Sequence, residues 1–446
     1  MNRSAITTWD PEDTAFWTTS GRTIARRNMW NSVFAEHLGF CVWSLWSVLV
    51  LFMSKKTGFA LSPGDKFLLV SVATLVGSAV RPAFALGVTT FGGRTWTTVS
   101  SLVLIIPVLL ATVLLGHPHA PLWAFLACAA VGGLGGGSFA ASTTNVNFFF
   151  PEREKGRALG INAGGGNLGV AVVQLLGLLV IAVAGASHPR ILAVIFVPLL
   201  LAAAIAAYTR MDNLPGMRTG GGVYRAALRD PHCWRISLLY VGTFGSFIGY
   251  SFAFGLVLQN DFGRSPLQAA AVTFIGPLLG SIARPAGGAL ADRFGAARIT
   301  LISFTGMMLG TAVVIAASVA HSLPLFTVAF SVLFLLTGLG NGSTYAMIGG
   351  PYAAAAEQAI AGGADPFAAR SQARRKAGAV IAFAGTVGGL GGVAINLAFR
   401  QSYISAHNAR PALAGFLVYY AVCTAVTAMA GSQRAVTVPA PAEVSA

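Results

Sequence analysis

Charge is scarce in this sequence. Only 10% of its 446 residues are Asp, Glu, Lys or Arg, whereas a soluble globular domain carries about 25%. Hydrophobic residues make up 55% of the chain. This composition excludes an ordinary soluble domain and indicates a protein that crosses a membrane many times. The net charge of +15 does not point to nucleic acid as a partner, because the cations lie in many short polar segments between apolar runs.

Cysteine is almost absent as well. The four cysteines are scattered without metal-ligand spacing, which favours a role as small packing residues. The sequence also contains no pairing of a nucleophile with a base and no cofactor fingerprint. We therefore predict no metal, no cofactor and no enzymatic activity.

Long apolar runs are what the chain does have. Each is long enough to cross a bilayer as a helix, which takes about 20 residues. The sequence thus predicts an all-α membrane protein with twelve transmembrane helices, in the inner (cytoplasmic) membrane. These helices are expected near residues 33–54, 67–91, 96–116, 121–150, 157–185, 191–209, 235–258, 268–291, 299–320, 323–349, 377–399 and 411–431.

An internal repeat divides the chain. The stretch Gly77–Ala83 (GSAVRPA) returns as Gly280–Ala286 (GSIARPA), 203 positions later. At the same offset, Phe91-Gly92 returns as Phe294-Gly295. We therefore predict two pseudo-symmetric six-helix bundles, residues 1–209 and 235–446, joined by a polar, glycine-rich linker at 210–234.

Loop charge predicts the orientation of these bundles. The side that holds both termini carries 20 of the 29 lysines and arginines, and the opposite side carries 7. By the positive-inside rule, both termini are expected in the cytoplasm.

Each repeat places one arginine inside a span, at Arg81 and Arg284. A guanidinium at the centre of a membrane costs roughly 2.5–3.5 kcal/mol on insertion scales, and it cannot lose its proton. Each arginine could pair with an acid of its own half. The duplication, with no obvious acid nearby, favours the alternative that both face one anion site between the halves.

Four further groups of residues are candidates for function. Glu36 and His37, at the edge of the first span, could relay a proton or could lie inertly at the headgroup level. Asn167 sits deep in the fifth span, where its amide can donate to an anion. Tyr240 and Phe244 share a helix face, which is typical of core packing but would also suit a small planar anion. Asp292, in the pattern Gly-x-Leu-x-Asp-Arg-x-Gly, could latch one conformation together with Arg293.

That last pattern, within Gly288–Arg298, resembles the major facilitator superfamily. The glycine–asparagine segments Gly132–Gly169 and Gly338–Ser343, and the arginines of the second and eighth spans, are more narrowly similar to the nitrate/nitrite porter family. The Glu36-His37 pair looks like the subgroup regarded as proton-coupled nitrate importers. The exchanger subgroup tends to be apolar there.

The resemblance implies a substrate site and a mechanism. Arg81 and Arg284 would clamp the anion, and the segments around it would contribute Asn167, Tyr240, Phe139, Phe244, Gly137, Gly342 and Ser343. The partners expected are nitrate, nitrite, protons and the lipid bilayer around a monomer.

The predicted function is therefore secondary transport of nitrate, and of nitrite, by rocker-switch alternating access, with uptake by proton symport favoured. Three alternatives stay open: a nitrate/nitrite antiporter, an exporter of organic anions, and a membrane receptor that senses nitrate without moving it.

Overall fold

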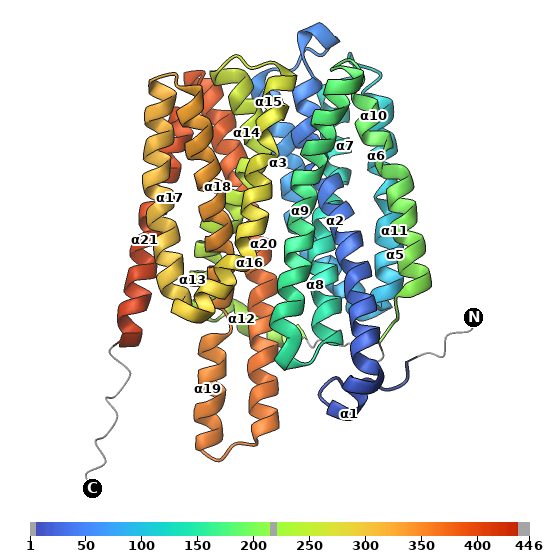
Figure 1. Cartoon of the computed structure of the whole chain (residues 1–446), viewed down its shortest axis with the longest axis vertical. Helices are drawn as coiled ribbons and strands as arrows, with labels where there is room; N and C mark the ends of the chain where they lie inside the picture. Colours follow the sequence, from blue (N-terminus) through green and yellow to red (C-terminus); the bar gives the residue numbers. More distant parts are fainter. Residues whose placement is uncertain (1–5, 215–220, 436–446) are drawn as a thin grey trace.

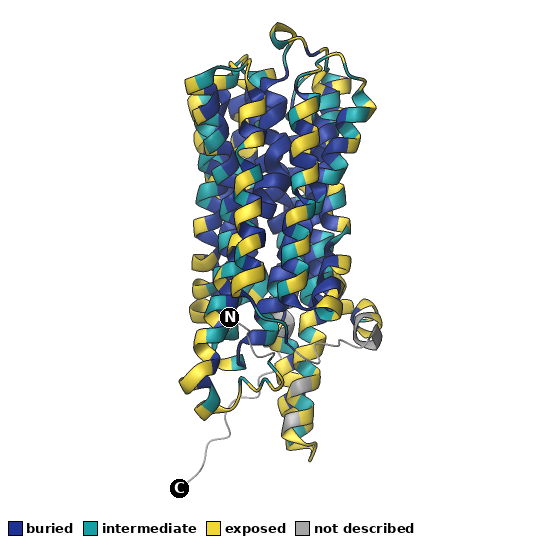
Figure 2. Cartoon of the chain, turned by 90° about the vertical axis from the view of Figure 1, so that its right-hand side faces the viewer, coloured by how far each residue is buried: buried dark blue, intermediate teal, exposed yellow. Residues whose placement is uncertain are grey.

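The computed structural model describes residues 6–214 and 221–435, and these are helical with no strand. Within them, twelve helical segments are long and apolar enough to cross a membrane, as the sequence predicts. Figure 1 shows the segments running roughly parallel, with α1 and the end of α21 at the lower end of the view. In Figure 2, the faces turned outward are largely exposed and the interior is buried.

Five of the first six spans comprise several helices each because short irregular turns interrupt them, and the fifth is a single helix. The first span enters through α1 (Thr14–Phe16) and the π-helix η1 (Trp17–Gly21) and continues as α2 (Arg22–Phe52). A short 3-10 turn, η2 (Lys55–Thr57), follows at the upper end. The remaining helices of this half are α3 (Pro63–Ala79), α4 (Arg81–Phe91), α5 (Gly93–Val103), α6 (Ile105–Leu114), α7 (Leu122–Gly132), η3 (Gly133–Gly137), α8 (Ser138–Phe149), α9 (Glu152–Ala184), α10 (Pro189–Val194) and α11 (Phe196–Arg210).

The second half begins with a short helix, α12 (Gly221–Leu228), inside the predicted linker. Residues 215–220 of that linker lie outside the described part of the chain. The helices that follow are α13 (Pro231–Tyr240), η4 (Val241–Gly245), α14 (Ser246–Asp261), α15 (Pro266–Thr273), α16 (Ile275–Phe294), α17 (Ala296–Val319), α18 (Leu323–Ala346), α19 (Gly350–Ala361), α20 (Pro366–Ala406) and α21 (Arg410–Ala435).

The repeat seen in the sequence is also a repeat of backbone geometry. Gly92, between α4 and α5, has φ +87°, and Gly295, between α16 and α17, has φ +91°. These are the two glycines that the 203-residue offset pairs, and a side chain is disfavoured at such φ values. The two halves therefore turn between their second and third spans in the same way.

Close helix contacts repeat in the same manner. A Cβ added at Gly136 would come 2.7 Å from the Cα of Gly77, and one added at Gly338 would come 2.8 Å from the Cα of Gly280. In each half, small residues thus let the fourth span lie directly against the second. The second span is the one that carries the arginine.

The first and seventh spans are the most buried, and the third, ninth and twelfth are the least. Because α2 and the seventh span (α13, η4 and α14) are central in the molecule, their residues lie close to the two arginines.

Candidate functional site

Arg81 is the first residue of α4, directly after the break at Val80, and is 2% exposed. Its Nη1 donates a hydrogen bond of 2.5 Å to the carbonyl oxygen of Gly385 in α20, in the opposite half. The guanidinium carbon lies 4.9 Å from the ring centre of Phe244 and 5.0 Å from that of Phe139. Trp43 contributes a third ring at 5.5 Å.

Arg284 lies inside α16 and is 6% exposed. Its Nη2 donates to the hydroxyl of Tyr240 at 3.1 Å. Its guanidinium carbon lies 5.8 Å from the ring centre of Phe139 and 5.9 Å from that of Tyr345. Both arginines therefore lie against the same ring, Phe139, as their expected convergence on one site requires.

Several donors of this pair have no partner among the described residues. They are Nε and Nη2 of Arg81 and Nη1 of Arg284. Neither arginine has a carboxylate within ion-pair distance in the described part of the chain, and the two guanidiniums repel each other electrostatically. Buried N–H groups without acceptors are rare in proteins. The arrangement is thus suited to an anion that supplies the missing acceptors.

Aromatic rings form a wall beside these donors. Tyr240 and Phe244 are stacked with ring centres 5.3 Å apart and an interplanar angle of 18°. Phe244 and Phe139 are 6.4 Å apart at 26°. Phe139 of α8 therefore stacks on Phe244 of the seventh span, which in turn stacks on Tyr240 of the same span. A flat anion fits along such a surface.

Asn167 in α9 is completely buried, and neither atom of its amide has a partner among the described residues. Gly137 and Gly342, by contrast, serve packing: a Cβ at Gly137 would lie 2.5 Å from the ring of Phe84, and one at Gly342 would lie 2.7 Å from the backbone nitrogen of Gly288. Both glycines thus support the helices that carry the arginines. The hydroxyl of Ser343 is engaged with that of Thr300 in α17, at 2.8 Å.

Glu36 is fully buried and lies well inside α2, which begins at Arg22. Its Oε2 accepts hydrogen bonds from Ser142 at 2.5 Å and Asn162 at 2.7 Å, while its Oε1 has no partner among the described residues. Glu36 interacts electrostatically with both Arg284 and Arg81. It is therefore the acid that shares the interior with the two arginines.

The other predicted polar residues are less closely tied to the arginines. The Nδ1 of His37 lies 2.9 Å from the carbonyl oxygen of Gly165 in α9. Asp292 and Arg293 are exposed at the end of α16, and no hydrogen bond or ion pair involves them within the described residues. The guanidinium of Arg293 lies over its neighbour Phe294. The latch role of Asp292 and Arg293 stays a prediction.

Some neighbours of the arginines were not predicted. The carbonyl of Gly385 could not be found from residue type, because every residue has one. Tyr345 was within reach of sequence reasoning, since it follows the segment Gly338–Ser343 by two residues, and Trp43 follows Glu36 by seven residues on the same helix.

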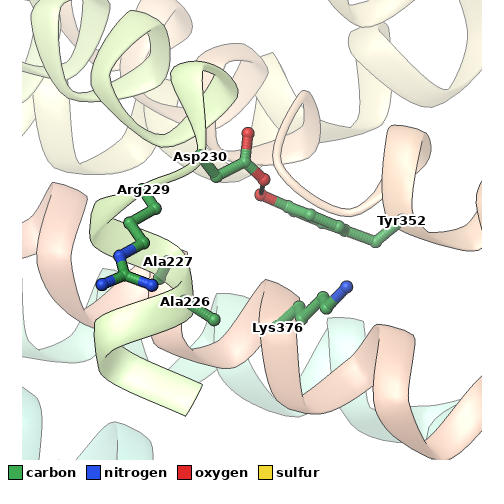
Figure 3. A pocket seen from close by; sticks show the side chains of 6 residues that line it. All are labelled: Ala226, Ala227, Arg229, Asp230, Tyr352 and Lys376. Carbon is green, nitrogen blue, oxygen red and sulfur yellow. Dashed lines mark hydrogen bonds between the residues drawn. The ribbon is translucent and has the colours of Figure 1, made fainter. Parts of the chain in front are cut away.

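Two hollows in the described structure lie away from the arginines. One, of about 190 Å³, lies between α12, α19 and α20, where Tyr352 donates to Asp230 at 2.6 Å and Lys376 extends toward them (Figure 3). The other, of about 440 Å³, lies mainly between α20 and α21 and has largely apolar residues around it, such as Ala398 and Phe416. Neither hollow includes a predicted substrate-binding residue.

The described residues contain no candidate metal site. In residues 6–214 and 221–435 no three His, Cys, Asp or Glu side chains are grouped so that they could hold a metal ion. The chemistry available at the site is that of buried cations, amides and aromatic rings.

Comparisons with known proteins show the family of this chain. The Major Facilitator Superfamily model matches residues 37–396. The nitrate/nitrite transporters NarU of Salmonella typhimurium and Escherichia coli are 37% and 35% identical, over 97% of this chain and 97% of theirs. A probable nitrate/nitrite antiporter, NarK2 of Thermus thermophilus, is 34% identical over 76% of this chain and 81% of its own length.

Among solved structures, a bacterial homologue of the lysosomal transporter Spinster, described as inward-facing and occupied, superposes with a TM-score of 0.65 at 17% identity. That match covers 93% of this chain and 98% of the other. The human organic anion transporter MFSD10 superposes with a TM-score of 0.63 at 14% identity, over 90% and 99% of the two chains. Likeness at such low identity concerns the fold alone.

Proposed function

This chain belongs to the nitrate/nitrite porter family of the major facilitator superfamily, and from that premise we propose that it transports nitrate, and nitrite with it, between two six-helix halves. The family makes it a multi-pass transporter of the inner membrane and not an enzyme. The observation that carries the proposal is the pair of buried arginines, Arg81 and Arg284, which both have donors without partners among the described residues and both lie against the ring of Phe139.

Nitrate suits this pair for physical reasons. It is planar and carries a single negative charge, and a guanidinium presents its donors in one plane. Two guanidiniums can therefore bind the anion edge-on from two sides while the stacked rings of Tyr240 and Phe244 cover its face. The bound anion also offsets the repulsion between the two cations, so the loaded site favours approach of the two halves.

Alternating access then follows from contacts at the two ends of the molecule. At the upper end, away from the chain termini, Phe67 of the first half stacks on Phe399 and Tyr403 of the second at 5.8 and 5.2 Å. At the lower end, Arg374 lies 3.6 Å from Glu152, and both side chains are more than a third exposed. An exposed pair of this kind contributes about 0–1 kcal/mol. The lower end is thus the one that opens at least cost from this state.

Coupling to protons is assigned to Glu36. In the proposed cycle Glu36 takes up a proton together with the anion, and the empty carrier returns with the pair of arginines balanced by the ionised carboxylate. His37 is the second proton-coupling candidate, in the next position of α2. Exchange of nitrate for nitrite is the rival mode, and it is favoured by the similarity to the Thermus relative, a probable nitrate/nitrite antiporter.

The test is uptake of nitrate into proteoliposomes that hold the purified chain. One arm applies an inward proton gradient with no internal anion, and the other supplies internal nitrite with no gradient. Uptake driven by the gradient alone is expected and establishes symport; uptake only with internal nitrite makes the protein an exchanger. Binding of nitrate without uptake in either arm would make it a sensor and overturn the transport proposal.

Variants at two acids sharpen this test. Glu36→Gln is expected to reduce gradient-driven uptake at least about tenfold while exchange is reduced less, because only the first mode needs the proton. Glu357→Gln is the matched control, since Glu357 is an exposed acid paired with Arg370 in the lower hairpin. Equal loss of both modes in Glu36→Gln would show that the carboxyl supports the fold and does not carry the proton.

A further inference from the structure

Asn341, in α18, is a buried amide for which the transport scheme above has no use. It is 1% exposed, and neither its Nδ2 nor its Oδ1 has a partner among the described residues. Other buried asparagines do use their amide nitrogen: Asn162 donates to Glu36, and Asn396 donates to the carbonyl of Gly392 at 2.8 Å. Asn341 shares its unpartnered state with Asn167, which the family resemblance places at the anion.

Helix geometry shows which way Asn341 faces. Phe334, Asn341 and Tyr345 lie seven and four residues apart, so they share one face of α18. At one end of this face, the ring of Phe334 packs edge-on against Phe247 of α14. At the other end, the ring of Tyr345 lies 5.9 Å from the guanidinium of Arg284 in α16. The face thus looks into the space between the seventh span and α16, and Asn341 lies between its two ends.

The neighbours of Asn341 on α18 contact the elements on either side of this direction. Gly340 approaches Thr243 and Ser303, and Ser343 is bonded to Thr300 of α17. Gly342 packs against the backbone of α16 at Gly288 and at the carbonyl oxygen of Arg284 itself. Asn341 is therefore one residue away from a direct backbone contact with the helix turn that carries Arg284.

The internal repeat shows that this amide has no polar counterpart. Gly136 packs on Gly77 and Gly338 packs on Gly280, so these two glycines correspond at an offset of 202, and Asn341 then corresponds to Phe139 in the first half. Phe139 carries an apolar ring that lies against both arginines. The second half thus adds an uncharged donor on one side of an otherwise symmetric pair of arginines.

An extra donor matters because nitrate and nitrite carry the same charge. The two arginines attract both anions alike, so charge cannot separate them. The anions differ in shape: nitrate has three oxygens, and nitrite has two oxygens and a lone pair on nitrogen. A site with a donor for the third oxygen disfavours the anion that leaves this donor unpaired.

Resting on the proposed function, we infer that Asn341 is a specificity-determining residue of the anion site, whose amide donates to the nitrate oxygen that nitrite lacks. The amide N–H is suited to this role because it adds a donor without adding charge. The residue makes the carrier prefer nitrate over nitrite at equal concentration.

The experiment measures nitrate and nitrite dissociation constants from the rise in melting temperature of the purified full chain as each anion is added. The variant is Asn341→Leu, which is close in size to asparagine and removes the amide. Asn396→Leu is the matched control, because Asn396 is equally buried but bonded within its own helix. The expected result is a nitrate constant raised about tenfold in Asn341→Leu and a nitrite constant changed less than about twofold, with neither constant changed in the control.

The melting temperature without anion provides the second readout. Replacing an unpartnered amide by an apolar side chain is expected to leave it unchanged or to raise it. A lower melting temperature, or equal weakening of both anions, would assign Asn341 a structural role and overturn the inference. Unchanged constants would overturn it as well. A wild-type chain that binds neither anion would instead refute the proposed transport function.

Discussion

At the scale of single residues, the geometry of the guanidinium matters more than its charge. Arg81 uses Nη1 for the carbonyl of Gly385 and Arg284 uses Nη2 for Tyr240, which leaves other donors of the same plane for an anion. A lysine at either position keeps the charge but offers one compact ammonium that cannot serve both partners at once. The hydrogen bond to Gly385 or Tyr240 and the hydrogen bond to the anion would then compete for the same ammonium group.

We therefore expect Arg81→Lys and Arg284→Lys each to weaken nitrate binding at least about tenfold, which corresponds to about 1.4 kcal/mol. The measurement is the nitrate dissociation constant of each purified variant. Arg298→Lys is the control, because Arg298 is exposed at the start of α17 and far from the interior. Near-normal affinity in either of the first two variants would exclude the proposed clamp.

These two arginines were predictable from sequence because charge inside an apolar run is costly and its duplication is conspicuous. The structure brings Tyr240, Phe244 and Phe139 beside them, as the resemblance implied. Asn341 was not predicted as a site residue. Its significance depends on the absence of a partner in three dimensions, which residue type and spacing do not reveal.

At the scale of elements, the contact between the second and fourth spans of each half sets where the arginines lie. Gly338 of α18 touches the backbone of α16 at Gly280, one turn before Arg284. Glycine permits this approach because it has no side chain. Gly136 contacts Gly77 in the first half for the same reason. A methyl group at such a contact must push the two helices apart.

We expect Gly338→Ala to destabilise the folded protein by about 1–3 kcal/mol, as overpacking generally does. Its added Cβ would lie 2.8 Å from the Cα of Gly280 and 2.9 Å from the Cβ of Ala283. The control is Gly288→Ala in α16, where an added Cβ meets nothing within 4 Å. Thermal unfolding in detergent compares them; equal melting temperatures for the two variants would show that α16 and α18 can separate at no cost.

Helix positions were predictable because apolar runs are long, whereas helix ends and polar helices were not. The first span was expected from residue 33, but α2 begins at Arg22, which is why Glu36 lies well inside the helix. The helix α19 was missed altogether, and α20 begins at Pro366, eleven residues before the expected start. Both segments are rich in alanine, and the start of α20 is also rich in charge, so they extend as helices below the apolar runs.

At the scale of the whole molecule, the state of the carrier could not be predicted from sequence. Both conformations of an alternating-access protein use the same helices, and they differ in contacts between halves that are distant in sequence. Phe67 with Phe399, and Gln174 donating to the carbonyl of Ser251 at 2.7 Å, are contacts of this kind. They are formed by residues more than 70 positions apart, for which local patterns carry no signal.

The orientation of the molecule is predictable from sequence, and it decides which side the upper end faces. Figure 1 places α1, the end of α21 and the α19–α20 hairpin at the lower end. Since 20 of the 29 lysines and arginines belong to that side, the lower end is expected in the cytoplasm and the Phe67 stack on the outside. This assignment makes the present state one that is closed toward the outside, as uptake into the cell requires before release of the anion.

Cysteine labelling tests this orientation, because the four native cysteines are all buried. Ala60, in the loop between α2 and α3, and Ala364, between α19 and α20, are both exposed alanines. We expect a membrane-impermeant maleimide to label Ala60→Cys in intact cells and Ala364→Cys only after lysis. The unmodified chain serves as the control for background labelling. The reverse pattern would place the termini outside, and the contacts that close the upper end would then block release to the cytoplasm instead of return to the outside.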